Sequence, residues 1–251
     1  MGQSTETQPN GLLFCYSLNM GWTDEYKEIV EFYYWEPQHI GRAKGVRRFD
    51  GPKDMWSHVN KLEISLNHIL SLFFSLYSGS LLFDKIGAHG GPYLLTPSGQ
   101  LEEWDKETKG FVQPDLFFKG DNKNLAIELK LDSKTNLNQI SKYVALNGWV
   151  DQDKPLDLIF LTPHKNLTKV TKEKYANFEG LINELRAVEL HKKIQSACSQ
   201  ELYQKQVDML SINCLSFSEF YRILQEIKPE NSTEEKLLSG LIHYLRGRGL
   251  I

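Results

Sequence analysis

Three charged residues lie in or beside two apolar segments near the middle of the chain. Glu128 and Lys130 are separated by one residue in the run 124–131, and Asp115 lies in the preceding run 111–118. Alternate residues of a β-strand share a face, so Glu128 and Lys130 are expected to project together. Burying unpaired charges is costly, and a metal ion with a second carboxylate is one arrangement that supports them.

The two apolar runs are joined by residues 119–123, a segment rich in turn residues, so we expect an antiparallel hairpin. Pro114 cannot donate to a sheet ladder and marks a strand start or bulge, where Asp115 can be turned toward Glu128. Carboxylates of this kind suit Mg²⁺ or Mn²⁺, which bind through one or two carboxylates together with substrate phosphates. The pattern therefore indicates phosphate chemistry.

These residues resemble a known family. Pro-Asp115 followed by Glu128-Leu-Lys130 is similar to the PD-(D/E)XK signature of restriction endonucleases, Holliday-junction resolvases and RecB-type exonucleases. Gln139 and Tyr143 resemble the QxxxY motif of the RecB-type branch, and positions four apart share a helix face. Glu-x-Lys occurs elsewhere in the chain, but only Glu128-Leu-Lys130 lies inside an apolar strand, and Pro-Asp occurs once.

The resemblance implies a role for each residue. Lys130 would position the attacking water or stabilise developing charge, while Gln139 and Tyr143 would orient phosphates or the core itself. The metal would orient and acidify a water for in-line attack on a phosphodiester. The implied ligands are Asp115, Glu128 and the backbone carbonyl of Leu129, with Glu63 at the place where many members carry an additional acidic ligand.

The elements that must position these residues indicate an α/β fold. The expected architecture is a mixed central β-sheet flanked by helices, a restriction-endonuclease-like core formed by residues 52–251 and ending in C-terminal helices. An N-terminal elaboration, residues 1–51, would precede it, with strands at 11–19 and 29–35 and a helical turn at 21–27. In the core we expect helices at 52–77, 133–147, 216–227 and 233–245, mainly helical structure at 171–204, strands at 80–86, 156–162 and 207–214, and a polar hairpin at 97–110.

Simpler interpretations exist for the same residues. Asp115, Glu128 and Lys130 could form a cross-strand salt bridge on an exposed sheet face. Glu63 could be solvated on the polar side of its helix, and Tyr143 could serve only in helix-to-sheet packing. The histidines His58, His68 and His89 are expected to face solvent and are left out of the site.

A Gly-rich basic segment precedes the first core helix. It contains Arg42, Lys44, Arg47 and Arg48 and is expected to contact nucleic-acid phosphates, because its glycines let the backbone approach closely. A second cluster, Lys165, Lys169, Lys172 and Lys174, is expected to be ordinary surface.

Composition limits the class of protein. The chain has 251 residues, 24% charged and 41% hydrophobic, as expected for a folded globular protein. Its net charge of −3 argues against general coating of nucleic acid but allows a local basic patch. Three cysteines without paired spacing indicate neither a disulfide framework nor a thiolate zinc site. No apolar run is long enough for a membrane span and the opening residues lack signal-peptide features, so we expect a cytoplasmic protein.

The sequence as a whole therefore predicts a Mg²⁺-dependent (or Mn²⁺-dependent) deoxyribonuclease, with RNA not excluded as substrate. A role in restriction, phage defence or repair would suit it, as would a homodimer or a larger defence or repair complex. Two alternatives stay open: a catalytically inactive module of the same fold that binds nucleic acid or protein, and a nuclease that a small molecule or protein activates.

Overall fold

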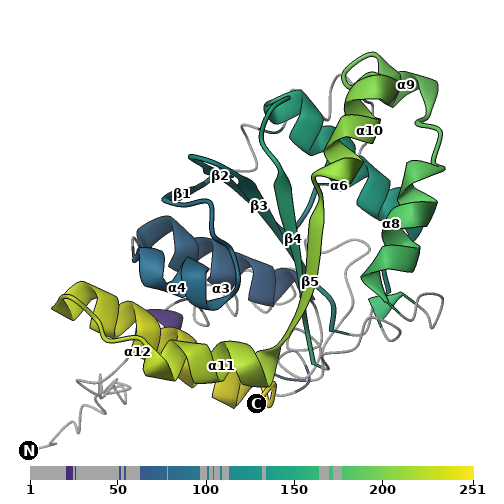
Figure 1. Cartoon of the computed structure of the whole chain (residues 1–251). Helices are drawn as coiled ribbons and strands as arrows, with labels where there is room; N and C mark the ends of the chain where they lie inside the picture. Colours follow the sequence, from purple (N-terminus) through teal and green to yellow (C-terminus); the bar gives the residue numbers. More distant parts are fainter. Residues whose placement is uncertain are drawn as a thin grey trace, which may run out of the picture.

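The computed structural model describes residues 21–24, 26, 51, 54, 63–77, 79–96, 101, 104, 108, 113–131, 134–163, 170–171 and 177–251. A five-stranded mixed sheet runs through the middle of this part of the chain (Figure 1). Its strands are β1 (Tyr93–Leu95), β2 (Leu116–Gly120), β3 (Asn124–Leu129), β4 (Leu156–Thr162) and β5 (Ser211–Ser216).

The strands lie side by side in chain order. β1, β2 and β3 form antiparallel pairs, and β3, β4 and β5 form parallel pairs. Parallel neighbours need long crossover connections, and helices supply them. The sheet is therefore mixed, as the sequence predicts, with its antiparallel part at the β1 edge.

Helices cover both faces of the sheet (Figure 1). One face carries α3 (Glu63–Leu76), α4 (Ser80–Lys85), α11 (Phe217–Glu226) and α12 (Ser232–Gly247). The other carries α6 (Leu137–Val150), α8 (Phe178–Arg186), α9 (Lys192–Gln195) and α10 (Gln200–Asp208). No helix of the described part combines the length and apolarity that crossing a bilayer requires.

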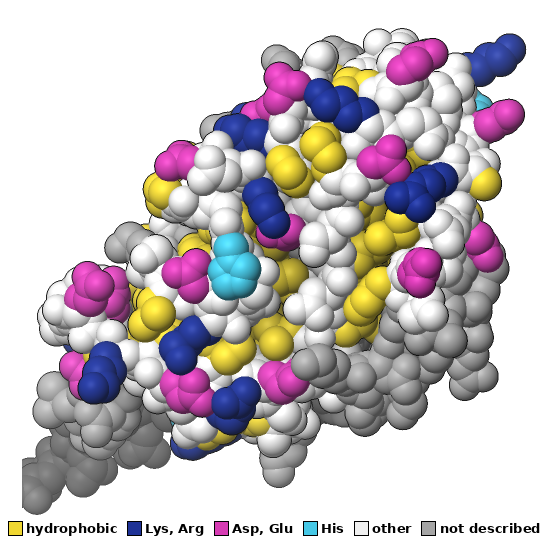
Figure 2. All heavy atoms as spheres, viewed as in Figure 1, with side chains coloured by type: hydrophobic (Ala, Val, Ile, Leu, Met, Phe, Trp, Pro, Cys, Tyr) yellow, Lys and Arg dark blue, Asp and Glu magenta, His cyan; other side chains and the backbone are white. Residues whose placement is uncertain are grey.

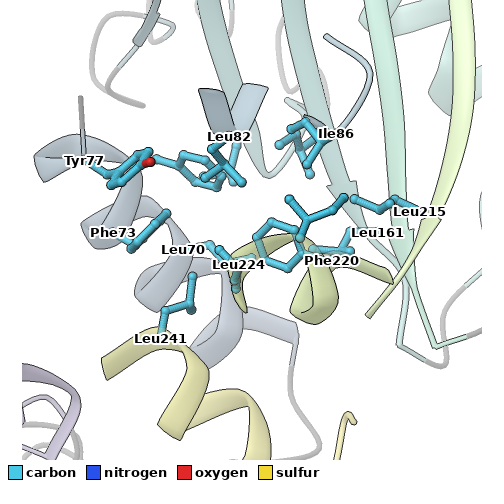
Figure 3. Packing of buried hydrophobic residues seen from close by; sticks show 14 of the residues in the cluster. Leu70, Phe73, Tyr77, Leu82, Ile86, Leu161, Leu215, Phe220, Leu224 and Leu241 are labelled. Atoms are coloured by element: carbon cyan, nitrogen blue, oxygen red, sulfur yellow. The ribbon is translucent and has the colours of Figure 1, made fainter. Parts of the chain in front are cut away.

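Each face has its own hydrophobic core. On the α3 side, Leu125, Ile127 and Leu129 of β3 pack among the helices, as the predicted alternation requires. Figure 3 shows how this core fixes α3 against the neighbouring helices and the sheet: side chains of Leu70 and Phe73 from α3, Leu82 from α4, Phe220 and Leu224 from α11, and Leu241 from α12 gather beside Leu161 and Leu215. Truncating a buried phenylalanine in such a core costs about 3–5 kcal/mol.

The N-terminal turn contacts this same face. Trp22 donates its indole N–H to the Lys236 carbonyl at 3.2 Å and lies against Gly240 of α12, where a Cβ atom would collide with the indole. Tyr26 hydrogen-bonds His68 of α3 at 3.2 Å. Residues 22–24 and 26 are helical, which confirms the predicted turn for those positions; the strands predicted at 11–19 and 29–35 lie outside the described residues.

Several predicted elements are wrong or shifted. Residues 80–85 form helix α4 rather than a strand, since a short apolar run does not distinguish the two. Leu82 and Phe83 are buried together with Ile86, which follows them by four and three residues, while Leu81 is exposed. In the segment 97–110, predicted as a hairpin, the described Trp104 and Thr108 are helical. β1 was not predicted.

Some helices and strands begin at other residues than predicted, because capping residues set where a helix starts. The helix predicted at 133–147 begins after Asn136, whose side chain accepts from the Gln139 backbone N–H. The helix predicted at 233–245 is α12, which begins at Ser232 and is capped by Asn231. The predicted strand 207–214 begins only at Ser211, after α10. The helix predicted at 216–227 is confirmed as α11, which begins with a capping box formed by Ser216 and Glu219.

Candidate active site

The β2–β3 hairpin brings two carboxylates together. Asp115 directly precedes β2, and the pairing of Leu116 with Ile127 places Asp115 opposite Glu128. The Asp115 backbone N–H donates to Glu128 Oε2 at 3.3 Å, and the Leu129 N–H donates to Asp115 Oδ2 at 2.8 Å. The predicted hairpin is confirmed, and the start of β2 immediately after Pro114-Asp115 agrees with the prediction from proline.

Glu128 and Lys130 form a buried ion pair. Their exposed fractions are 4% and 6%, and Lys130 Nζ lies 2.7 Å from Glu128 Oε1. Glu128 projects from the face of β3 opposite to Leu129 and contacts Gln139 of α6. Lys130, directly after the strand, joins it there. The alternative interpretation of an exposed cross-strand salt bridge is therefore wrong, because the pair lies along one strand and is shielded from solvent.

Helix α6 contributes two further polar groups to Glu128. The Gln139 amide nitrogen donates to Glu128 Oε1 at 2.9 Å and to the Tyr143 hydroxyl at 2.6 Å. Tyr143 is 1% exposed and packs in the core on this side of the sheet, so it combines packing with a hydrogen bond. Burial, with the nearby charge of Glu128, raises the pKa of the Tyr143 phenol far above its usual range.

Thr135 fixes the orientation of the Gln139 amide. Its hydroxyl donates to Gln139 Oε1 at 3.0 Å, which directs the NH₂ group of Gln139 toward Glu128. Thr135 is buried, four residues before Gln139, and its own N–H donates to the Val170 carbonyl. Sequence reasoning missed this residue, although its spacing from Gln139 offered a signal.

Helix α3 approaches the carboxylates from the other side. The Glu63 carboxylate accepts a hydrogen bond from the Leu131 backbone N–H at 2.7 Å, which anchors the helix to the end of β3. Asn67, one turn later, donates its amide N–H to Asp115 Oδ1 at 3.0 Å, and Ser71 donates to Asn67 Oδ1 at 3.3 Å. Glu63 is thus engaged with β3 rather than merely solvated, and Asn67 was missed although it lies four residues from Glu63 on the same helix face.

Asp115 has an unusual protonation equilibrium. Burial and, next, the negative charge of Glu128 raise its pKa from 3.8 to about 7, and Glu63 adds a smaller contribution in the same direction. The Leu129 N–H and the charge of Lys130 act against this rise. The second carboxylate is therefore hard to ionise next to the first without an added positive charge.

The donor set fits a Mg²⁺ or Mn²⁺ ion. Asp115 and Glu128 supply two carboxylates, and such ions keep several waters and need only one or two protein carboxylates. In a strand the N–H and C=O of one residue point to the same side, so the Leu129 carbonyl faces Asp115. Among the described residues no group of three or more His, Cys, Asp or Glu side chains is arranged as a metal site; the candidate ligands are two carboxylates and a carbonyl.

Asn67→Ala is expected to weaken Mn²⁺ binding by about tenfold, because outer partners that orient a ligating carboxylate typically matter by that factor or more. Isothermal titration calorimetry at pH 8 measures the effect. Asn183→Ala on α8, an exposed asparagine bonded to Arg186, is the matched control. Equal affinities in both variants and wild type would show that Asp115 is held without Asn67.

Other predicted residues lie away from this cluster. Arg42, Lys44, Arg47 and Arg48 lie outside the described residues, as do His58 and the four lysines between positions 165 and 174. His89 is exposed beside Asp84 at 3.6 Å, as predicted, and His68 is exposed on α3. On the face drawn in Figure 2, lysines and arginines alternate with aspartates and glutamates, so this face carries no field of one sign.

The chain was compared with protein families, curated proteins and solved structures. No protein-family model, curated protein or solved structure matches the chain. The functional interpretation therefore depends on the residues, contacts and charges described above.

Proposed function

We propose that this protein is a metal-dependent nuclease of the PD-(D/E)XK kind, acting on DNA or RNA. The proposal depends above all on one observation, the convergence of Asp115, Lys130 and Gln139 on Glu128 within hydrogen-bonding distance. Asp115 lies at the start of β2, Glu128 and Lys130 at the end of β3, and Gln139 on α6. Each was singled out by its place in the motif. A cluster of perturbed, buried titratable groups is typical of functional sites.

Asp115, Glu128 and the Leu129 carbonyl would hold the Mg²⁺ or Mn²⁺ ion. Bound there, the ion would supply an activated water and charge neutralisation for phosphodiester hydrolysis. Lys130, beside Glu128 Oε1, lies where it can position that water or stabilise charge on the phosphate. Gln139 holds Glu128 in place, and Tyr143 supports Gln139. Glu63 secures α3 against β3 and lies near enough to influence Asp115 electrostatically.

The direct test is cleavage of supercoiled plasmid, linear duplex and single-stranded DNA or RNA with Mg²⁺ or Mn²⁺, with EDTA as the negative control. We expect metal-dependent products from wild type and a loss of at least about a hundredfold in Asp115→Ala and Lys130→Ala, since both remove groups at the reacting centre. Glu226→Ala is a matched control, because this exposed carboxylate pairs with Lys85 and Arg222 far along the chain from the site.

The outcomes separate the competing functions. Equal activity in wild type and both site variants would contradict the proposal and point to another site or a contaminant. Mn²⁺ binding by wild type without cleavage of any substrate would favour the nuclease that waits for an activating signal. Neither metal binding nor cleavage would favour the inactive binding module.

A further inference from the structure

Exposed leucines gather beside the candidate site. Within the described part of the chain, the exposed large hydrophobic residues are Leu72, Leu76, Leu81, Leu94 and Ile251. Three of these five, Leu72, Leu76 and Leu94, line one surface groove, with exposed fractions of 39%, 59% and 76%. Scattered exposed leucines are ordinary, but several in one concave place mark a binding surface.

The groove joins this apolar surface to the candidate active site. It runs over the neighbouring α3 and β1, has a volume of about 1240 Å³, and includes Asp115 and Asn67 in its lining. We call it the α3–β1 groove. Because Asp115 is part of its lining, the groove offers a path for a polymeric substrate that is bound at the candidate metal site.

Positive charge lies away from Asp115 in the same groove. Lys119 of β2 and Lys154 both belong to the lining, and Lys154 also pairs with Asp151 at 3.2 Å. Among the described lining residues Asp121 is the one carboxylate besides Asp115. Asp115 and Lys119 are four positions apart along the chain, or roughly 13 Å in extended backbone. This corresponds to about four stacked nucleotides of one strand. The groove thus reaches from the candidate metal ligand Asp115 to Lys119, and the exposed Leu94 lies directly opposite Lys119 in the β1–β2 pair.

We propose that the α3–β1 groove holds a single-stranded segment of nucleic acid that leads away from the scissile phosphate at Asp115. Unpaired nucleotides expose the flat apolar faces of their bases, which pack on apolar side chains such as Leu76 and Leu94. A duplex hides those faces and presents charged phosphates, which would meet the leucines unfavourably. The inference depends on the proposed nuclease function and specifies its substrate as single-stranded or frayed.

The test measures binding of short fluorescein-labelled DNA and RNA oligonucleotides by fluorescence anisotropy, with Ca²⁺ in place of Mg²⁺ to limit cleavage. Leu94→Glu and Leu76→Glu are the groove variants. Leu81→Glu, on α4 and 47% exposed, is the matched control because it makes the same substitution and the same change of net charge outside the groove. We expect the groove variants to bind single strands about tenfold more weakly and Leu81→Glu to stay within about twofold of wild type.

Mn²⁺ affinity, measured by calorimetry, is expected to be unchanged in all three leucine variants. Three outcomes would each overturn the inference. The groove variants could bind oligonucleotides as tightly as the control variant. Wild type could bind a blunt duplex as tightly as a single strand or more tightly, or could fail to bind single strands. Metal-dependent duplex cleavage with unchanged KM in the groove variants would remove this inference and leave the nuclease proposal standing. Absence of Mn²⁺ binding by wild type would instead remove the nuclease proposal. Comparison of the DNA and RNA oligonucleotides shows which sugar the groove accepts.

Discussion

Glu128→Gln is expected to abolish metal-dependent cleavage and to destabilise the fold at once. Cleavage should fall by at least about a hundredfold, because Glu128 is a proposed metal ligand. Substituting a residue that only hydrogen-bonds to a metal ligand usually has a smaller effect on activity. The free energy of unfolding should fall by about 3 kcal/mol, because Lys130 would be left buried without its anion. The substitution keeps the shape of the side chain, so both effects report on charge rather than on packing.

A second substitution separates the two effects. Replacing Lys130 with methionine in the Glu128→Gln background removes the unpaired cation and leaves a neutral side chain of similar length. We expect urea unfolding to show recovery of most of the lost stability, while cleavage stays at background. If Glu128→Gln alone unfolds at the wild-type urea concentration, then the ion pair contributes little and the burial argument is wrong.

The part of the site that lies on the hairpin was predictable from sequence. Apolar runs joined by turn residues gave the pairing of β2 with β3, and strand alternation placed Glu128 and Lys130 on one face. Asp115 lies opposite Glu128 because the short loop between β2 and β3 fixes the register of the two strands. Contacts between residues close in sequence follow from local rules, and these contacts are of that kind.

The contacts that α3 makes with the site were harder to predict from the sequence. Asn67 and Asp115 are 48 residues apart, and their contact depends on how the hydrophobic core seats α3 against the sheet. No local pattern sets that position. Glu63 was found only through the family resemblance, and its hydrogen bond to the Leu131 backbone was not anticipated.

The misassigned helix α4 has a different cause. The run Leu81-Leu82-Phe83 is equally compatible with a buried strand and with one helical turn. The Tyr77 side chain lies against Gly79, and Leu82 and Phe83 then reach the core from a helical backbone, whereas Leu81 stays exposed. Tertiary packing therefore favours the helix over the strand at a place where the local sequence is compatible with both.

Asp115→Asn is expected to stabilise the metal-free protein at pH 8 while it removes metal binding. The folded protein holds the Asp115 proton up to about pH 7, whereas the unfolded chain releases it near 3.8. Between these values the folded state binds more protons, so the stability of wild type falls as pH rises from about 4 to 7. A shift of this size corresponds to at most about 4 kcal/mol, and relaxation around a partly buried group lowers the expected gain to about 1–3 kcal/mol.

Asparagine does not ionise, so the variant lacks this pH-dependent loss. Its amide oxygen can still accept from the Leu129 N–H, and the Asn67 amide can turn to accept from the new NH₂ group, because Ser71 can act as donor or acceptor. Urea unfolding should show near-equal stability of the two proteins at about pH 4, part of the variant's advantage at pH 5 and all of it at pH 8. Wild-type Mn²⁺ affinity should fall about tenfold for each pH unit below 7, since the ion must displace one proton. A wild type whose stability and metal affinity are both flat from pH 5 to 8 would mean that Asp115 is already ionised at pH 5, and that Lys130, Asn67 and the Leu129 N–H outweigh its burial beside Glu128.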